Sequence, residues 1–323
     1  MMNETTSHSE ISVLITSMLE GDRRSLSKLI SLIDHDHTTV SKILTQLNTD
    51  KAEHSYCIGI TGPPGAGKST IVDCLISILT SQNNSVGVIA VDPSSNFTYG
   101  AILGDRIRMS DHVMDPNVFI RSMATRGDKG GISNVTSAAV RILKSFGFDY
   151  IIIESVGAGQ TQLQIADLSD TVIVTLVPEA GDNVQILKAG LLEIGDILIV
   201  NKADRTGANR IVNSIKEDGP TTRSSNWWEP PVLLTEANRC KGIDDVYIAI
   251  ENHRKALVDT DNLVKKRRER NLIEFNKVIQ ELIDSKIRSI GNISEHEDDL
   301  ISKVESGELD PYSGAIQAIG YTI

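Results

Sequence analysis

A glycine-rich segment at residues 62–69 carries the residue types that bind phosphate. It reads GPPGAGKS and matches the pattern G-x-x-x-x-G-K-[ST] at every fixed position. In this pattern backbone N–H groups surround an anion, Lys68 reaches the β- and γ-phosphates as a catalytic cation, and the Ser69 hydroxyl binds Mg²⁺. The sequence therefore predicts that a nucleoside triphosphate contacts Gly62, Pro63, Pro64, Gly65, Ala66, Gly67, Lys68, Ser69 and Thr70.

A second segment, Asn201-Lys202-Ala203-Asp204, has the residues that read a guanine base. Asn201 can bond the O6/N7 side of the base, and the aliphatic stem of Lys202 can cover the ring. The Asp204 carboxylate accepts from guanine N1–H and N2–H₂, which adenine does not offer. Further on, the Ala237 N–H is expected to meet guanine O6, with Glu236 and Asn238 beside it. The spacing from the phosphate loop favours GTP over ATP.

Carboxylates are the third chemical group of this predicted site. Glu154 ends an apolar run three residues before Gly157, which has the form of a Walker B and switch II element. Glu154 is then expected to hold Mg²⁺ or its water, while the Gly157 N–H senses the γ-phosphate. Asp92 and Asp105 are further candidates for the magnesium shell, directly or through water. The alternative for Asp92 is a turn or cap residue before a proline.

The group that orients the attacking water is not evident. The position after Gly157, which carries the water-orienting Gln in Ras-type GTPases, holds Ala158, and the nearest Gln is Gln160. We therefore expect slow hydrolysis that needs help from elsewhere in the protein or from a partner. The Arg- and Gly-containing stretch at residues 121–131 is either a functional loop or a long turn.

These residues need a sheet to bring them together. Strand-like and helix-like patterns alternate from Tyr56 to about Ile250, which predicts an α/β fold with a mostly parallel sheet covered on both faces. The predicted strands are Tyr56–Thr61, Val86–Val91, Val118–Ile120, Tyr150–Ile153, Thr171–Val177, Asp196–Val200 and Val232–Leu234. Ligands bind at the carboxyl ends of such strands. We expect a helical extension over residues 1–50, a nucleotide domain over 51–260 and a helical arm over 261–323.

Composition excludes several classes of function. The chain has 323 residues, a formal net charge of −11 and a pI near 5.1, which argues against a nucleic-acid or anionic-membrane binder. Its three cysteines lie far apart, so a disulfide framework is not expected, and Cys57 and Cys74 are interpreted as small core residues. Without a long apolar run or a visible signal peptide, we expect a cytoplasmic enzyme.

Taken together, these segments resemble the MeaB/ArgK family of P-loop GTPases. The likeness rests on residues 61–70, 91–109, 125–127, 154–157, 180–182 and 201–204, and it extends from Gly21 to Tyr312. Members of this family are GTPase chaperones of adenosylcobalamin-dependent methylmalonyl-CoA mutase. The resemblance implies a SIMIBI-type G domain that binds GTP, GDP and Mg²⁺.

The resemblance also implies partners. It implies a homodimer, joined by the C-terminal arm, that gates cofactor loading and protects a cobalamin-dependent acyl-CoA mutase. The loop at residues 178–188 becomes a further switch through which the mutase accelerates hydrolysis, with Gln185 and Lys188 as candidate helpers. Three residues depart from the usual family pattern, namely Glu236, Glu179 and Gln162. The departure at Glu236 bears on the affinity for guanine nucleotides. The departures at Glu179 and Gln162 bear on the rate of hydrolysis and on coupling to the partner.

Three other functions compete with this reading. A nickel-insertion GTPase needs a Cys/His metal site near the core, which the scattered cysteines do not supply. An ATP-dependent kinase, or an ATPase linked to basic amino-acid transport, is opposed by residues 201–204. A non-catalytic nucleotide-gated module is opposed by Lys68, Ser69 and Glu154, although Ala158 is compatible with a very slow switch.

Overall fold

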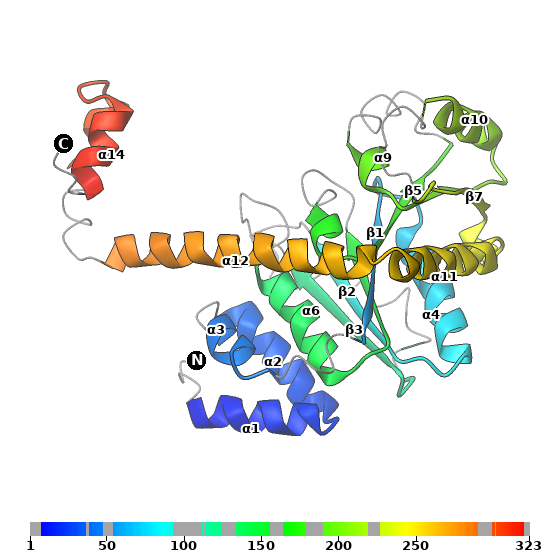
Figure 1. Ribbon diagram of the computed structural model, residues 1–323, viewed down its shortest axis with the longest axis horizontal. Coiled ribbons are helices and arrows are strands. Elements are labelled where there is room, and N and C mark those ends of the chain that lie inside the picture. The colour runs from blue at the N-terminus through cyan, green and yellow to red at the C-terminus, as the bar shows by residue number, and fades with distance from the viewer. Residues whose placement is uncertain are drawn as a thin grey trace. The chain divides into compact units, whose positions relative to one another are not determined.

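The structure, a computed structural model, describes residues 8–36, 39–47, 54–92, 112, 114–124, 134–155, 164–178, 190–218, 227–289, 299–300 and 302–319. Two compact units divide the chain, one that ends at Leu263 and one that begins at Val264. The first unit contains the sheet and all the residues of the nucleotide site that are described (Figure 1).

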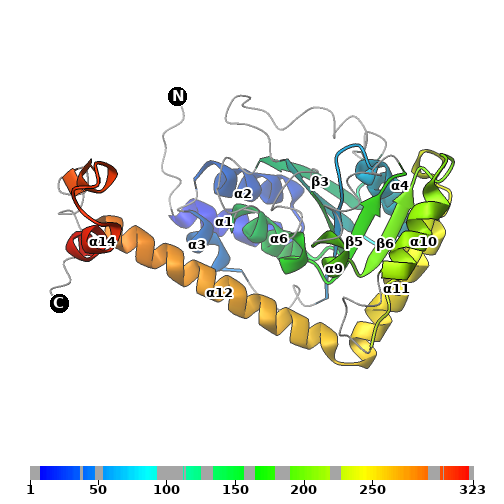
Figure 2. The same cartoon turned by 90° about the horizontal axis from the view of Figure 1, so that it is seen from above.

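A seven-stranded sheet in which every pair of neighbours is parallel forms the centre of the first unit. Its strands are β1 (Tyr56–Thr61), β2 (Val86–Asp92), β3 (Val118–Ala124), β4 (Tyr150–Ser155), β5 (Thr171–Leu176), β6 (Ile197–Asn201) and β7 (Val232–Thr235). They lie in the order β3-β2-β4-β1-β5-β6-β7, so β1 is central (Figure 2). The predicted parallel α/β architecture is confirmed.

Helices cover both faces of the sheet because its strands are apolar on both sides. Ile58 and Ile60 of β1 face one hydrophobic core, whereas Cys57 faces the other. The first core contains α4 (Lys68–Ser81) and α11 (Ile243–Asp259), and the second contains α6 (Asn134–Phe146), α9 (Leu191–Ile194) and α10 (Ala208–Asp218). Two short 3-10 helices, η3 (Ile165–Asp167) and η4 (Ala237–Arg239), complete the unit.

The N-terminal helices belong to the second of these cores. They are α1 (His8–Leu19), α2 (Arg23–His35) and α3 (Thr39–Leu44), and they pack beside α6 (Figure 1). Asp22 starts α2 as its N-cap, since its carboxylate accepts from the N–H groups of Arg24 and Ser25. The Arg23 guanidinium then donates to the carbonyls of Pro116 and Val118, which joins α2 to the edge strand β3.

Strand β3 is longer than the sequence predicts. The apolar pattern indicates a strand over Val118–Ile120, but the structure continues it to Ala124. The added residues include Arg121 and Ser122, which are only partly buried because β3 lies at the edge of the sheet. An edge strand tolerates polar side chains, so apolarity alone underestimates its length.

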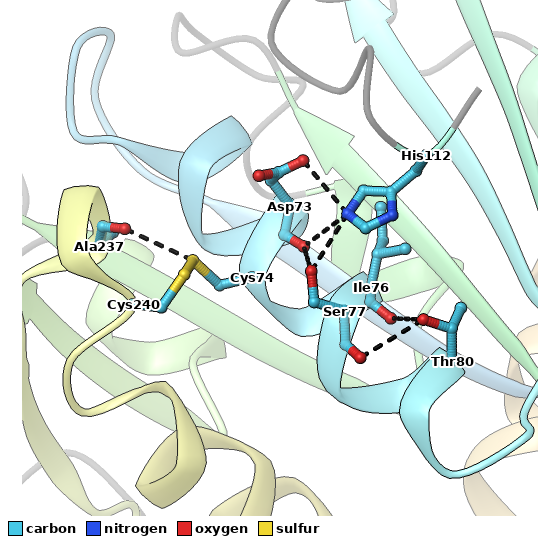
Figure 3. A network of polar contacts seen from close by, with 8 residues as sticks. All are labelled: Asp73, Cys74, Ile76, Ser77, Thr80, His112, Ala237 and Cys240. Atoms are coloured by element: carbon cyan, nitrogen blue, oxygen red, sulfur yellow. Dashed lines mark hydrogen bonds and ion pairs between the residues drawn. A yellow bond between two sulfur atoms is a disulfide. The ribbon is translucent and has the colours of Figure 1, made fainter. Parts of the chain in front are cut away.

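A disulfide joins Cys74 on α4 to Cys240, which directly follows η4 (Figure 3). This corrects the expectation that Cys74 is simply a small core residue; it is indeed buried, with 3% of its surface exposed, but it is covalently paired. The two cysteines are 166 residues apart in sequence, and only the packing of α4 against η4 brings their Cα atoms to 5.7 Å. Cys57 is buried and does not take part in the disulfide.

The second unit consists mainly of helices. Helix α12 (Asn262–Ser289) lies mostly in this unit, and α14 (Pro311–Ile319) follows. Asp310 caps α14 by accepting from the N–H groups of Tyr312 and Ser313. Apolar side chains on α12 are exposed, namely Val264, Leu272, Ile273, Phe275, Val278, Ile279, Leu282 and Ile283. Among the helices that the structure describes, none is long and apolar enough to cross a membrane.

Candidate functional site

The phosphate loop lies between the carboxyl end of β1 and the first turn of α4. Gly67 is the N-cap of α4 with φ 90°, and Gly62 has φ 141°. A Cβ at position 62 would lie 2.1 Å from the Thr175 carbonyl oxygen, and one at position 67 would lie 2.3 Å from Asn201 Nδ2. These two glycines are therefore required both by the backbone conformation and by the neighbouring atoms.

Alanine substitutions in this loop are expected to separate the two requirements. Gly65 also has a positive φ, but a Cβ there meets no atom within 4 Å. We expect Gly65→Ala to lower the free energy of unfolding by about 1–2 kcal/mol through backbone strain alone. Gly67→Ala adds overlap with Asn201, so we expect a loss of at least about 3 kcal/mol. Denaturant unfolding measures both, and equal losses would contradict the close approach at position 67.

Lys68 is the first residue of α4, and its side chain folds back against the backbone of the phosphate loop. Its ammonium donates to the carbonyl oxygens of Gly62 and Pro63, both at 3.0 Å, and only 6% of the residue is exposed. The charge is therefore held close to the loop by backbone groups. A cation in this position attracts phosphate oxygens strongly, because neighbouring protein reduces the screening by water.

Ser69 and Glu154 form the candidate magnesium site. The Ser69 hydroxyl donates to Glu154 Oε1 at 2.7 Å, and the two residues are only 6% and 2% exposed. Glu154 reaches this position because β4 pairs with β1 in register, with Glu154 beside Ile60. A hydroxyl and a carboxylate are oxygen ligands of the kind that Mg²⁺ prefers, so the residues fit this ion. Next to them, the Ser155 hydroxyl donates to Thr61 Oγ1 at 2.9 Å.

Asn201 connects the phosphate loop to the segment after β7. Its Nδ2 donates to the Ala66 carbonyl at 2.8 Å. Its Oδ1 accepts from the Thr235 hydroxyl and from the Ala237 N–H, both at 3.0 Å. Those two donors occupy both lone pairs of Oδ1, and only one Nδ2 hydrogen remains to reach a base acceptor such as N7. In this arrangement Asn201 primarily positions other parts of the site.

Removal of the Asn201 amide should therefore affect stability as well as binding. We expect Asn201→Ala to lower the free energy of unfolding by about 3 kcal/mol, because buried groups on three segments lose their partner. Asn213→Ala on α10 is the matched control, since Asn213 is exposed, and its change should stay within about 0.5 kcal/mol. Thermal or denaturant unfolding of both variants checks this. Equal stability of the two would remove the positioning role of Asn201.

The other residues predicted to read the base are accessible to solvent. Lys202 has φ 57° and is partly exposed, and Asp204 is exposed. The turn is fixed by a bond from the Ala203 N–H to the Thr235 carbonyl at 3.0 Å. Asp204 is therefore held in a fixed turn and is exposed to solvent. This placement agrees with the chemistry of guanine recognition, which needs an acceptor open to the ligand.

The segment after β7 places Ala237 in the interior and Asn238 at the surface. The Ala237 N–H, expected to meet guanine O6, donates to Asn201 instead. Glu236 turns to Lys241, whose ammonium lies 2.6 Å from its carboxylate, and Arg239 lies at 3.5 Å. The hydrogen bond from Lys241 holds the pKa of Glu236 below its usual range. Glu236 is thus an ionised, paired carboxylate.

Several predicted site residues lie outside the described part of the chain. These are Asp105, Gly157, Gln160, Gln185 and Lys188, together with the side chain of Asp92, whose backbone ends β2. Sequence reasoning missed Thr61, Ser155 and Thr235, which the structure places around the described residues. The available signal was that each lies within two residues of the end of a predicted strand.

Comparisons with known proteins identify a matching family and several similar proteins. The family model described as methylmalonyl-CoA mutase-associated GTPase MeaB matches residues 26–292. A Pyrococcus horikoshii protein named as a GTPase is 43% identical over 94% of this chain and 96% of its own length. The GTPase ArgK of Escherichia coli is 30% identical over 98% and 97%. The mouse methylmalonic aciduria type A homolog is 31% identical over 92% and 76%.

A solved structure supports the fold. The crystal structure of an LAO/AO transport system kinase matches 99% of both chains with a TM-score of 0.67 and 23% sequence identity. At this identity the likeness concerns the fold alone. The phosphate loop, the family model and the GTPase relatives lead to one conclusion. The chain is a GTPase and belongs to the methylmalonyl-CoA mutase-associated GTPase MeaB family.

Proposed function

We propose that this GTPase is a chaperone that gates cofactor loading and protection of an adenosylcobalamin-dependent acyl-CoA mutase. The observation that carries the proposal is the match to a family described by its association with methylmalonyl-CoA mutase over residues 26–292. The mouse relative, named for methylmalonic aciduria, supports the same connection. The geometry supports the GTP-binding part of the proposal, because the buried Ser69 hydroxyl and Glu154 carboxylate lie directly beside the phosphate loop.

The predicted site residues have defined roles in this proposal. Lys68 binds the β- and γ-phosphates, and Ser69 and Glu154 hold Mg²⁺, which neutralises phosphate charge when bound. Asp92 and Asp105 remain candidates for the same ion. Asp204 selects the guanine base. Asn201 holds the phosphate loop and the Ala237 segment in one arrangement.

In this proposal the partner mutase controls the rate of GTP hydrolysis. Ala158 stands where a water-orienting Gln stands in Ras-type GTPases, so the chain alone is expected to hydrolyse GTP slowly. Gln160, Gln185 and Lys188 are the candidate groups that a mutase would bring into position. We also propose a homodimer formed by the C-terminal arm, whose helix α12 exposes apolar side chains.

The proposal is tested by measuring GTP turnover with and without a purified adenosylcobalamin-dependent acyl-CoA mutase. We expect at least about tenfold stimulation, because a partner that completes a GTPase site is worth up to 10³–10⁵ in rate. Lys188→Ala should keep GDP affinity but lose much of the stimulation. A cobalamin-independent acyl-CoA enzyme is the matched control. Unchanged turnover with methylmalonyl-CoA mutase and with related mutases, together with no complex on size exclusion, would contradict the proposal.

A further inference from the structure

The Cys74–Cys240 disulfide links two elements that carry residues of the predicted nucleotide site. Cys74 is on α4, the helix that begins with Lys68 and Ser69 of the phosphate loop. Cys240 directly follows η4, whose first residue is Ala237. The disulfide therefore joins the phosphate-binding helix to the guanine-side segment, at residues that are far apart in sequence (Figure 3).

One side of this bridge is firmly held by the core. Buried apolar side chains on α4 pack under the sheet, namely Ile71, Val72, Leu75, Ile76 and Leu79. On a different side of the helix from the disulfide, His112 Nε2 lies 3.4 Å from the Asp73 carboxylate and 3.2 Å from the Ser77 hydroxyl (Figure 3). Helix α4 is thus the fixed anchor.

The other side is a tight turn near the surface, held together mainly by hydrogen bonds and ion pairs within the turn. Glu236 and Lys241 exchange two backbone hydrogen bonds, and the Cys240 N–H donates to the Ala237 carbonyl at 3.1 Å. Cys240 itself has φ 49°, a conformation that costs a side-chain-bearing residue energy. The residues between Ala237 and Lys241 are exposed. The disulfide is the covalent link that holds this turn against α4.

The position of the turn is transmitted to the phosphate loop. The Ala237 N–H donates to Asn201 Oδ1, and Asn201 Nδ2 donates to the Ala66 carbonyl. A displacement of Ala237 therefore changes the partner of Asn201, which also holds Ala66. Both the base-binding and the phosphate-binding parts of the site depend on where the turn lies.

We propose that the Cys74–Cys240 disulfide is a reversible redox switch that sets the affinity of this protein for guanine nucleotides. The oxidised form holds the turn at residues 236–241 in the arrangement that binds the base. The reduced form releases the turn from α4 and binds the nucleotide more weakly. This proposal rests on the proposed guanine site at residues 201–204 and 236–238.

The chemistry is thiol–disulfide exchange with a small dithiol or a protein dithiol as reductant. Cys240 is exposed and Cys74 is buried, so the attacking thiolate reaches the Cys240 sulfur. A mixed disulfide forms at Cys240, and the Cys74 thiolate leaves and takes a proton from water. The second thiol of the reductant then releases Cys240 as a thiol, and the reductant becomes a disulfide. Two electrons and two protons move in all, and oxidation by a small disulfide reverses both steps.

The reduced state has a defined alternative contact. Cys74 Sγ lies 3.4 Å from the Ala237 carbonyl oxygen, within reach of a thiol hydrogen bond. Between Cys74 and the turn, a weak hydrogen bond replaces a covalent one, so the turn occupies the binding arrangement only part of the time. If that fraction falls to about one third to one tenth, the apparent Kd for GDP rises about three- to tenfold.

The test measures the affinity and dissociation rate of a fluorescent GDP analogue on the full chain. One sample is oxidised with glutathione disulfide and the other is reduced with dithiothreitol, and mass spectrometry verifies the state of the cysteines. We expect the reduced protein to bind about three- to tenfold more weakly and to release the analogue faster. Cys240→Ser should match the reduced protein in both buffers, since Cys240 is exposed and its substitution spares the core.

Cys57→Ala is the matched control, because Cys57 lies on β1 outside the disulfide, and this variant should respond to redox state like the unmodified chain. Equal GDP affinity in the two verified states would overturn the proposal, even where oxidation raises the melting temperature. Failure of the disulfide to form in glutathione disulfide would also overturn it. If neither state binds GDP, the guanine site is wrong and this proposal falls with it, an outcome distinct from redox-independent binding.

Discussion

Lys68→Ala is expected to lower kcat/KM for GTP hydrolysis by at least about 100-fold. The Lys68 ammonium is the cation held at the phosphate loop, where the Gly62 and Pro63 carbonyls lie 3.0 Å from it. Alanine removes the charge that would stabilise the β- and γ-phosphates as negative charge shifts during hydrolysis. Lys68→Arg keeps a charge but not its compact shape, so we expect little recovery of rate.

Measurement of phosphate release under multiple turnover checks this prediction. Lys42→Ala on α3 is the control, because Lys42 is an exposed lysine outside the nucleotide site. Circular dichroism and thermal unfolding show whether the Lys68 variants remain folded. Folded Lys68→Ala protein that hydrolyses GTP within threefold of the unmodified chain would exclude Lys68 from phosphate binding.

Asp204→Asn is expected to weaken GDP binding by about 100-fold and to create binding of xanthosine diphosphate. The exposed Asp204 carboxylate can accept from both N1–H and N2–H₂ of guanine, and such bonds to a charged group contribute about 1.5–3 kcal/mol each. The Asn amide keeps an oxygen that accepts from N1–H, but its NH₂ group faces the 2-amino group of guanine. Two donors then face each other and cannot form a hydrogen bond. Xanthine has a carbonyl at that position, so the amide finds a partner again.

Competition titration with GDP, xanthosine diphosphate and ADP measures the change in selectivity. Asp259→Asn at the end of α11 is the matched control and should leave all three affinities unchanged, because it is exposed and lies outside the base-reading segments. A variant at position 204 that loses GDP without gaining the xanthine nucleotide would point to a structural role for Asp204. Unchanged GDP affinity would exclude it from base recognition.

The architecture of the nucleotide core could be predicted because it depends on local pattern. Strand β1 has the predicted bounds Tyr56–Thr61, and helix α4 follows the phosphate loop, as the alternation of strand-like and helix-like patterns predicts. Parallel topology then explains why two distant motif residues meet. Ser69 comes shortly after β1, at the start of α4, and Glu154 lies near the end of the adjacent strand β4, so the hydroxyl and the carboxylate lie 2.7 Å apart.

Features that depend on packing between distant segments could not be predicted. The pattern at residues 201–204 suggests that Asn201 reads the base, but its bonds to Ala66 and Ala237 require the positions of two other segments. The Cys74–Cys240 disulfide likewise requires α4 and η4 to be adjacent, which cysteine spacing does not indicate. The length of β3 depends on its edge position, where polar side chains remain partly exposed.

Calorimetric titration of the purified protein with GDP and with ADP, both in Mg²⁺, tests most directly whether residues 201–204 form a guanine site next to the phosphate loop. We predict that GDP binds and that ADP binds at least about 100-fold more weakly, since adenine lacks the N1–H and N2–H₂ donors that Asp204 accepts. Equal binding of ADP would contradict the assignment of Asn201, Lys202 and Asp204. The proposed guanine-nucleotide gating of a mutase would then fail as well.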